Sequence, residues 1–475
     1  MNRQIARLFG FFVVLFAVLI AATSWSSVLG ARGLQDNAHN RRPLLEAQRI
    51  PRGLIFARDG TKLAVNRHTG SGETLRYFRA YPTGPLFSHA VGYSYVSRGS
   101  AGIEKSYNRE LTGQENEFKS LIDQFSGGTK DGDDVHTTLD PKGQRTAISA
   151  LGGQRGSIVA VEPSTGAIRV MYSDPDYNPN QVPGQYSQLN SDPSSPLFNR
   201  ATQARYPPGS TFKVVTAAAA LDSGRYTPDS VISGRNNKII SGVPLQNDGG
   251  ADYGPISLTD GLTHSVNTVF GEVGEKLGKD TMFRYMDRFG FGSRLSLDYP
   301  RDEITPSGVF QGQRILGPSD SVDIGRVAIG QERLQVTPLQ MAMVAASVGN
   351  GGRLMEPRLV DRVVAPDGTV REQFNPRERA QVMSGRTASE LGQMMTKVVQ
   401  EGTGTASALS GFQVAGKTGT AEVVRGTTNQ AWFIAFAPVD HPRIAIAVTV
   451  ERTSGQGGTV AAPIAKQVME ALLHG

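Results

Sequence analysis

Ser210 and Lys213 form a Ser-x-x-Lys pair that opens an alanine- and valine-rich stretch, residues 212–221. Two prolines and a glycine precede Ser210, so we expect this serine at the amino terminus of a helix. Free backbone N–H groups and the dipole favour negative charge there, and residues three apart share one helix face. A serine hydroxyl needs a base to become a nucleophile, and a lysine can be that base only as the neutral amine. The pair predicts a serine nucleophile with a lysine base; the alternative is an N-cap serine and an exposed lysine.

Two further motifs follow in chain order and favour the catalytic interpretation. Ser265 and Asn267 form a Ser-x-Asn motif between two helical stretches, and Lys417, Thr418 and Gly419 form a Lys-Thr-Gly motif on a strand. Ser-x-x-Lys, Ser-x-Asn and Lys-Thr-Gly in this order are the signature of penicillin-binding proteins and serine β-lactamases. A second Ser-x-Asn, at residues 106–108, precedes the nucleophile and lies in the amino-terminal part of the chain, so we exclude it.

Residues 411–418 also satisfy the nucleotide-binding pattern Gly-x-x-x-x-Gly-Lys-Thr. A phosphate loop must leave a strand and enter a helix whose amino terminus receives the phosphates. The residues after Gly419 continue as strand instead, so we reject nucleotide binding.

Composition narrows the class of protein. The chain has 475 residues, 39% of them hydrophobic, which predicts two or three domains. It contains no cysteine, which excludes disulfides, thiolate metal sites and a cysteine nucleophile. Its seven histidines include no His-x-x-x-His pair, which argues against a zinc hydrolase. The formal net charge of +6 fits a nucleic acid, an anionic membrane or an anionic wall polymer equally well.

The amino terminus predicts a single membrane anchor. No charged residue occurs from Leu8 to Ala31, and about 20 apolar residues suffice to cross a bilayer. Arg3 and Arg7 precede this stretch, which favours a cytoplasmic amino terminus and an extracytoplasmic remainder. The alternative is a cleaved signal peptide whose apolar region ends near Ala22. The rest of the chain is exported in both cases.

The pattern of the remainder predicts an α+β fold. We divide the chain into a cytoplasmic stub and transmembrane anchor (1–31), an amino-terminal non-catalytic module (32–145) and a catalytic domain (146–475). Within the catalytic domain, a long surface loop is expected over 174–209 and one antiparallel sheet that uses both ends of the domain. The expected strands are 157–161, 167–171, 413–424, 431–439 and 443–450. Helices are expected over 212–221 and 461–473, and helical patterns occur around 258–288, 337–348 and 387–400.

Beyond the three motifs, longer blocks resemble the penicillin-binding proteins. They are residues 206–213, 330–332 with 336–342, and 415–422 with 431–438. In the amino-terminal module, residues 52–60 and 102–107 resemble motifs of the class B, monofunctional members, although Ala57 stands where that family usually has Asp. The size and single anchor look most like the short penicillin-binding protein A type of actinobacteria. The resemblance implies a transpeptidase domain with a five-stranded antiparallel sheet flanked by helices.

The resemblance also implies a role for each motif residue. Ser210 attacks a D-Ala carbonyl, Lys213 takes its proton, and Ser265 relays protons between Lys213, Lys417 and the leaving amine. Asn267 holds the donor peptide backbone and orients Lys213. Lys417, Thr418 and Thr420 hold the terminal carboxylate, and Gly419 is also among the substrate-binding residues. The backbone N–H groups of Ser210 and Thr420 form the oxyanion hole, and no metal or organic cofactor is required.

The implied function is a peptidoglycan D,D-transpeptidase that is a target of β-lactams. There are two alternatives: a D,D-carboxypeptidase or β-lactamase-type hydrolase, with the same acylation chemistry but water as the acceptor, and a non-catalytic β-lactam sensor. The implied partners are peptidoglycan stem peptides, β-lactams, the membrane through one span, and a glycan polymerase with division or elongation proteins, but no nucleic acid.

Overall fold

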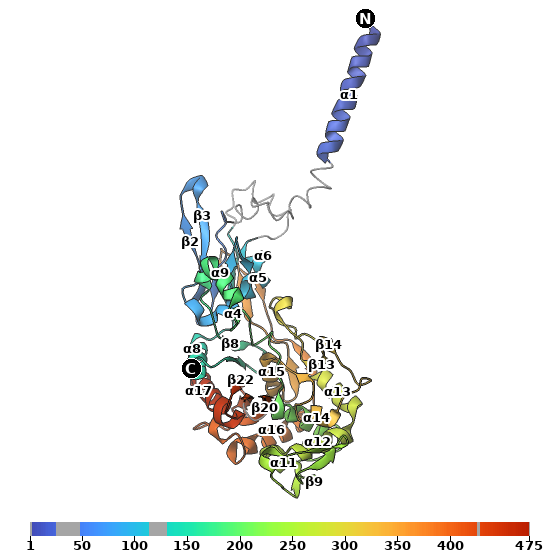
Figure 1. The fold of residues 1–475 in the computed structure, drawn as a ribbon. Coiled ribbons are helices and arrows are strands. Elements are labelled where there is room, and N and C mark those ends of the chain that lie inside the picture. The colour runs from blue at the N-terminus through green and yellow to red at the C-terminus, as the bar shows by residue number, and fades with distance from the viewer. Residues whose placement is uncertain (1, 25–47, 114–130, 425–427, 475) are drawn as a thin grey trace. The chain divides into compact units, whose positions relative to one another are not determined.

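The computed structural model describes residues 2–24, 48–113, 131–424 and 428–474 (Figure 1). At the amino terminus, α1 (Asn2–Ser24) is an isolated apolar helix. Its segment Arg3–Thr23 has a mean hydropathy of 2.6 and is long enough to cross a membrane. This helix agrees with the uncharged stretch expected there.

A five-stranded antiparallel sheet forms the centre of the catalytic domain, as the sequence predicted. Its strand order is β20-β21-β22-β7-β8. Strand β7, from the start of the domain, therefore pairs with β22, from its end. Strand β21 is buried over nearly its whole length, because helices cover both faces of the sheet. The strands are β7 (Gly156–Val161), β8 (Ile168–Asp174), β20 (Ala415–Val424), β21 (Thr428–Ala437) and β22 (Ile444–Thr453).

Different helices cover the two faces of this sheet. On one face, α8 (Pro141–Leu151) and α17 (Ala462–Leu473) pack against each other and against the sheet around Ile158, Ile446 and Val448. On the other face, α15 (Pro338–Gly349) packs on β7, β21 and β22. The boundary that we expected between residues 145 and 146 falls inside α8.

The predicted helices of the middle region are present. The stretch 258–288 contains α11 (Leu258–Thr263), α12 (Asn267–Leu277) and α13 (Lys279–Arg288). The helices separate where Ser265 has φ 58° and Gly278 has φ 77°, a left-handed conformation that no helix interior tolerates. The remaining long helices are α10 (Lys213–Asp222), α15 and α16 (Gly385–Gln400).

The expectation of a continuous loop over 174–209 is wrong in part. This segment contains a 3-10 turn, Pro179–Gln181, followed by the helix α9 (Val182–Ser191). Val182, Tyr186 and Leu189 pack on the core at helical spacing, but the polar residues and the proline and glycine among them favoured a loop in the sequence. The remainder of the segment is irregular.

A second sheet combines the amino-terminal module with a distant part of the chain. Its strand order is β18-β17-β6-β1-β2-β3, and β17 and β18 come from the catalytic half of the sequence. Strand β1 pairs in parallel with β6, and β17 pairs antiparallel with β6. The strands are β1 (Ile55–Phe56), β2 (Lys62–Thr69), β3 (Arg76–Ala80), β6 (Asp134–Thr137), β17 (Val360–Val364) and β18 (Val370–Gln373).

Two buried carboxylates hold this region together. Glu104 is fully buried and forms ion pairs with Arg79 and with Arg52, the latter at 2.9 Å. Burial alone raises the pKa of Glu104, but the two guanidinium groups outweigh it and hold that pKa below its ordinary value. The class B-like motifs therefore meet in one charge cluster.

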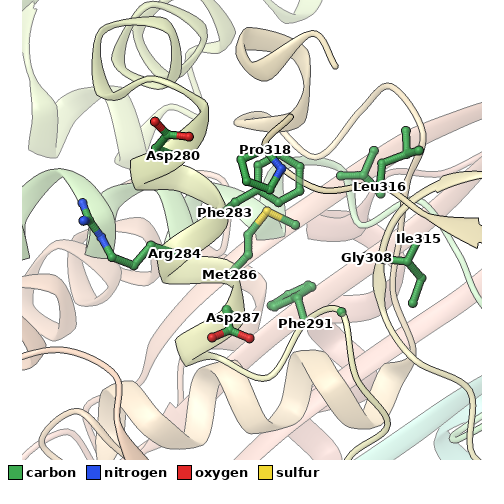
Figure 2. Close-up of a pocket in the computed structure, with 12 residues that line it drawn as sticks. Asp280, Phe283, Arg284, Met286, Asp287, Phe291, Gly308, Ile315, Leu316 and Pro318 are labelled. Atoms are coloured by element: carbon green, nitrogen blue, oxygen red, sulfur yellow. The ribbon is translucent and has the colours of Figure 1, made fainter. Parts of the chain in front are cut away.

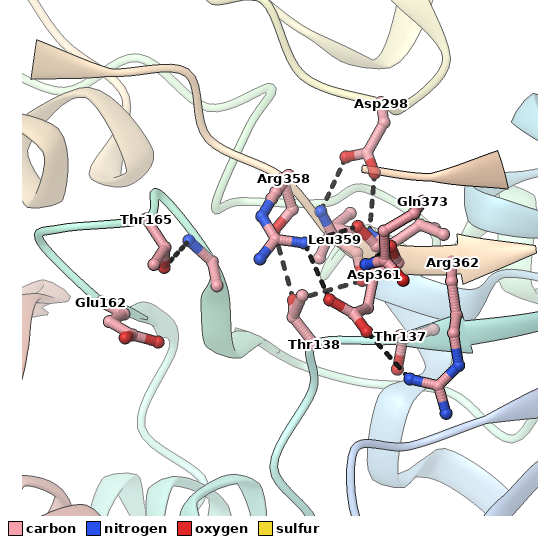
Figure 3. A network of polar contacts seen from close by, with 12 residues as sticks. Thr137, Thr138, Glu162, Thr165, Asp298, Arg358, Leu359, Asp361, Arg362 and Gln373 are labelled. Carbon is pink, nitrogen blue, oxygen red and sulfur yellow. Dashed lines mark hydrogen bonds and ion pairs between the residues drawn. The ribbon is translucent and has the colours of Figure 1, made fainter. Parts of the chain in front are cut away.

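The second carboxylate is that of Asp298, which lies in a loop next to the first residues of β17 (Figure 3). It accepts hydrogen bonds from the backbone N–H groups of Leu359 and Val360, each at 2.7 Å, and from the Tyr107 hydroxyl at 3.3 Å. Burial raises the pKa of Asp298 to about 6. Asp298 thus ties a loop of the catalytic half to β17 and to the amino-terminal module.

Candidate active site

Ser210 lies in a single 3-10 turn, Gly209–Phe212, directly before α10 begins at Lys213. Ser210 therefore lies at the amino terminus of the helix, as expected, one turn ahead of the first α-helical residue. Gly209 has φ 53°, and a Cβ there would lie 2.7 Å from the carbonyl oxygen of Thr420. Only glycine permits this turn to approach β20 so closely.

Backbone contacts from three distant segments fix the turn. The Gly209 N–H donates to the Gly330 carbonyl at 3.0 Å, and Tyr206 exchanges two backbone hydrogen bonds with Val336 at 2.8 and 2.9 Å. The buried Trp432 donates its indole N–H to the Pro207 carbonyl at 3.0 Å. The family-like blocks around 330–342 and 431–438 thus position the residues that lead to Ser210.

Lys213 is completely buried, and its amine is held in one place. Its Nζ donates to the Ser265 carbonyl at 2.6 Å, to Asn267 Oδ1 at 2.7 Å and to Ser265 Oγ at 3.3 Å. Burial lowers the pKa of Lys213 well below its ordinary value, and the neighbouring Lys417 ammonium lowers it further. Both effects favour the neutral amine, and a neutral amine can accept a proton.

Lys417 lies on β20 and reaches the same hydroxyl from the other side. Its Nζ contacts Ser265 Oγ at 3.0 Å and donates to the Thr418 carbonyl at 3.0 Å. Burial lowers the pKa of Lys417 to about 7. The Ser265 hydroxyl therefore lies between two amines, and both have a pKa below the ordinary value of lysine.

Asn267 is the first residue of α12, and both ends of its amide are engaged. Its Oδ1 accepts from Lys213, and its Nδ2 donates to the Gln246 carbonyl at 2.9 Å. The left-handed backbone at Ser265 makes the break between α11 and α12 that turns Ser265 and Asn267 toward Lys213.

These residues meet at a polar cleft of about 1130 Å³. The amines of Lys213 and Lys417 lie beneath its floor, since both side chains are completely buried. The Thr418 hydroxyl contacts the Thr403 hydroxyl at 2.6 Å, and the Thr420 hydroxyl accepts from the Gly457 N–H at 3.2 Å. The predicted site residues that line the cleft are Ser210, Ser265, Asn267, Thr418, Gly419 and Thr420.

The two patterns that we rejected have other places in the structure. Strand β20 runs without interruption through Lys417, which pairs with Ile434 of β21, so no helix follows the lysine as a phosphate loop requires. Ser106 donates to the Gly102 carbonyl within the amino-terminal module and does not line the cleft.

Known families match almost all of the chain beyond residue 51. Residues 156–470 match the penicillin binding protein transpeptidase domain, and residues 52–135 match the penicillin binding protein A dimerisation domain. The peptidoglycan D,D-transpeptidase PbpA of Mycolicibacterium smegmatis is 36% identical, with 100% of this chain and 99% of that protein covered. The protein of the same name from Mycobacterium tuberculosis is 34% identical over 100% of both chains. The chain belongs to the penicillin-binding protein family.

Solved structures agree with this assignment. The ceftriaxone acyl-enzyme complex of penicillin-binding protein A from M. tuberculosis superimposes with a TM-score of 0.81 at 33% identity, covering 90% of this penicillin-binding protein and 100% of that chain. The D,D-transpeptidase domain of a peptidoglycan glycosyltransferase from Eggerthella lenta gives a TM-score of 0.78 at 34% identity, over 90% of this chain and 99% of its own. The expected family and fold are confirmed.

Sequence reasoning missed several residues that shape the cleft of this penicillin-binding protein. The loop before the Ser-x-Asn motif contributes Gln246, which holds Asn267, and the buried Asn247, which accepts from the Thr268 N–H at 3.0 Å. Thr403, between α16 and β20, contributes a hydroxyl to the floor. The cluster of Asn, Asp and Gly at 247–250 signals a turn in the sequence, but nothing local connects that turn to Ser210.

A separate cavity of about 390 Å³ between α13 and the hairpin of β13 (Gly308–Gln311) and β14 (Arg314–Ile315) is mostly apolar (Figure 2). Met286 and Leu316 line it, and no serine or lysine does among the described residues around it. Its inner wall includes Phe291, whose ring packs edge-to-face on Phe212 at 5.6 Å. This cavity therefore lies behind the turn that contains Ser210 and is separate from the polar cleft.

Proposed function

We propose that this penicillin-binding protein is a peptidoglycan D,D-transpeptidase that cross-links stem peptides through an acyl-enzyme on Ser210. The observation that carries the proposal is the completely buried Lys213 amine, three residues after a serine that opens onto the cleft; burial and the neighbouring Lys417 lower the pKa of this amine and favour its neutral form. A serine nucleophile needs such a base, and an exposed helix lysine could not serve, because it is protonated at neutral pH.

In the acylation step, Ser210 Oγ attacks the carbonyl carbon of the penultimate D-Ala of a stem peptide, and Lys213 Nζ takes the hydroxyl proton. The peptide C–N bond then breaks, and the leaving amine of the terminal D-Ala receives a proton. Ser265 provides the path for it, since its Oγ lies 3.3 Å from the Lys213 amine and 3.0 Å from the Lys417 amine. Proton transfer by positioned groups typically contributes about 10²–10⁴ in rate.

The same cleft offers groups for binding the donor peptide. Thr418 and Thr420 present hydroxyl groups, and Lys417 presents the cation, for the terminal carboxylate. The backbone N–H groups of Ser210 and Thr420 form the oxyanion hole, which the contact of Gly209 with the Thr420 backbone supports. Loss of one such donor typically costs about 10²–10³ in rate. Asn267 orients Lys213 and binds the donor backbone, with Gly419 allowing the close approach.

An acceptor amine from a neighbouring stem peptide then resolves the ester into a cross-link. We place the catalytic domain outside the cell, anchored by one span over Arg3–Thr23, because Arg3 and Arg7 precede an uncharged apolar helix. The division into residues 1–31, 32–145 and 146–475 remains part of this proposal. So does the expectation that a glycan polymerase and division or elongation proteins are partners.

Fluorescent penicillin tests the nucleophile. The parent protein should be labelled, Ser210→Ala should not, and Ser106→Ala, from the second Ser-x-Asn motif, should be labelled like the parent. Mass spectrometry should place the adduct on the peptide that contains Ser210. An adduct elsewhere, or full labelling of Ser210→Ala, contradicts the proposal.

A second experiment separates the transpeptidase from the hydrolase alternative. Donor peptide and a D-amino acid acceptor are supplied together, and exchanged product is measured against released D-Ala. A transpeptidase forms exchanged product in proportion to acceptor. Release of D-Ala alone at every acceptor concentration, with or without a polymerase, identifies a carboxypeptidase instead.

A further inference from the structure

A second polar cavity, of about 560 Å³, lies beside the segment that leads to Ser210. Tyr206 and Pro207 form one wall, and the end of β22 forms another. We call it the arginine cavity, after the charged residues of its lining in the described part of the chain: Arg155, Arg200, Arg205, Arg452 and one acid, Glu451.

Glu451 is occupied by interactions within the protein. One of its oxygens accepts from Arg200 Nε at 2.9 Å and from the Tyr206 hydroxyl at 2.5 Å. Arg200 is buried, with 3% of its side chain exposed, and its other nitrogens donate to the Ser194 and Ser195 carbonyls. Glu451 and Arg200 therefore form a neutral structural pair that holds Tyr206, and the cavity keeps the charge of three other arginines.

These three guanidinium groups still have donors to offer. Arg155 is 44% exposed and approaches Glu451 through Nε alone, at 3.4 Å. Arg205 lies over the Phe310 ring at 4.2 Å and donates to Gln313 through one nitrogen. Arg452 is exposed, and the described residues include no hydrogen-bond partner for its guanidinium. Planar guanidinium groups with free donors match the two oxygens of a carboxylate.

The cavity is near the reacting atoms but separate from the donor site. Tyr206 and Ser210 are four residues apart, so their Cα atoms are at most about 15 Å apart. An extended peptide spans that distance in about five residues. The catalytic cleft has its own groups for the donor carboxylate, Lys417 and the hydroxyls of Thr418 and Thr420. A second carboxylate site beside the nucleophile therefore suits the second peptide of the reaction.

We propose that the arginine cavity binds a carboxylate of the acceptor stem peptide while its amine attacks the Ser210 ester. This inference rests on the proposed transpeptidase function. In that step the amine nitrogen forms a bond to the ester carbonyl carbon, the bond to Ser210 Oγ breaks, and the amine proton passes through Lys213 to Ser210 Oγ. The cavity takes no part in the bond changes; it lowers the acceptor concentration that the reaction needs and orients the amine.

The test compares two acceptors and two variants. A synthetic stem tripeptide with a free amine is made once with free carboxylates and once with each carboxylate as a carboxamide. The double variant Arg155→Gln/Arg452→Gln should raise the acceptor KM about tenfold for the carboxylate peptide, since exposed charge-assisted hydrogen bonds are lost. The carboxamide peptide should change less than about twofold, and high salt should reduce the difference. Arg377→Gln, at an arginine that is 79% exposed, is the matched control.

Each outcome bears on a different claim. Three results for the double variant overturn the acceptor site: the acceptor KM rises equally for both peptides, it rises for neither, or acylation by the donor peptide becomes slower. Titration of the carboxylate tripeptide into Ser210→Ala provides a readout without turnover, and binding there must weaken in the double variant. If the parent protein is not acylated at all, the proposed function fails. If acylation and transfer occur but the two acceptors respond alike, this inference alone fails.

Discussion

Replacing Lys213 with methionine tests the central chemical step, because the two side chains have similar length and methionine has no amine. The change leaves two partly buried acceptors, the Ser265 carbonyl and Asn267 Oδ1, without their donor. Each such loss costs up to about 3 kcal/mol. Removing a desolvated amine beside Lys417 offsets part of that cost. We therefore expect a folded protein, destabilised by less than the roughly 6 kcal/mol of two full losses, whose acylation is slower by about 10²–10⁴.

The assay is the second-order rate of labelling by fluorescent penicillin, measured from pH 6 to 9 together with thermal unfolding. The parent rate should fall as pH drops, because protonation of Lys213 removes the base, and this dependence should disappear in Lys213→Met. Lys397→Met, which removes an exposed ion pair with Glu401 of 3.0 Å, is the matched control and should react like the parent. A folded Lys213→Met protein that keeps more than a tenth of the parent rate refutes a role for Lys213 as the base.

Three further changes test the scaffold. Glu104→Gln should lower the free energy of unfolding by about 3–5 kcal/mol in urea titrations, because Arg79 loses its buried counter-charge. Gly209→Ala puts a Cβ 2.7 Å from a carbonyl of β20, so penicillin acylation should slow by about 10² while the protein stays folded. Burial raises the pKa of Asp298 from 3.8 to about 6, so the folded state binds that proton more tightly than the unfolded state. The free energy of unfolding of the parent should therefore fall by about 3 kcal/mol as pH rises between these values. Asp298→Asn should abolish this fall in urea titrations across pH 4–6.

The residues that meet at the candidate site could be singled out from the sequence because their signals are local. Prolines and glycine before Ser210 determine where the helix starts, and the spacing to Lys213 places the amine on the same face. Ser265, Asn267 and Lys417 are recognisable because short motifs of fixed order carry them. The central sheet was equally predictable, since β7, β8, β21 and β22 each contain an apolar run and turn residues separate β7 from β8.

Non-local features could not be predicted in this way. Strands β17 and β18 join the amino-terminal sheet from more than 200 residues beyond β6, and their local pattern does not identify that partner. Helix α9 packs through only three apolar residues, Val182, Tyr186 and Leu189, in a segment whose other residues are typical of loops. The arginine cavity draws on Arg155, Arg205 and Arg452, which are isolated in the sequence and meet only when β7, the segment before Ser210 and the end of β22 come together.

The two buried lysines also couple substrate binding to catalysis. Burial lowers the pKa of Lys213, and the neighbouring Lys417 lowers it further, so the charge on one amine disfavours charge on the other. A carboxylate bound at Thr418 and Thr420 favours the charged form of Lys417, because an opposite charge raises the pKa of a lysine. The ammonium that results strengthens the repulsion that keeps Lys213 neutral. In the proposed mechanism, binding of the donor peptide thus favours the neutral form of Lys213. A peptide amidated at that carboxylate should acylate Ser210 with a pH dependence displaced to higher pH.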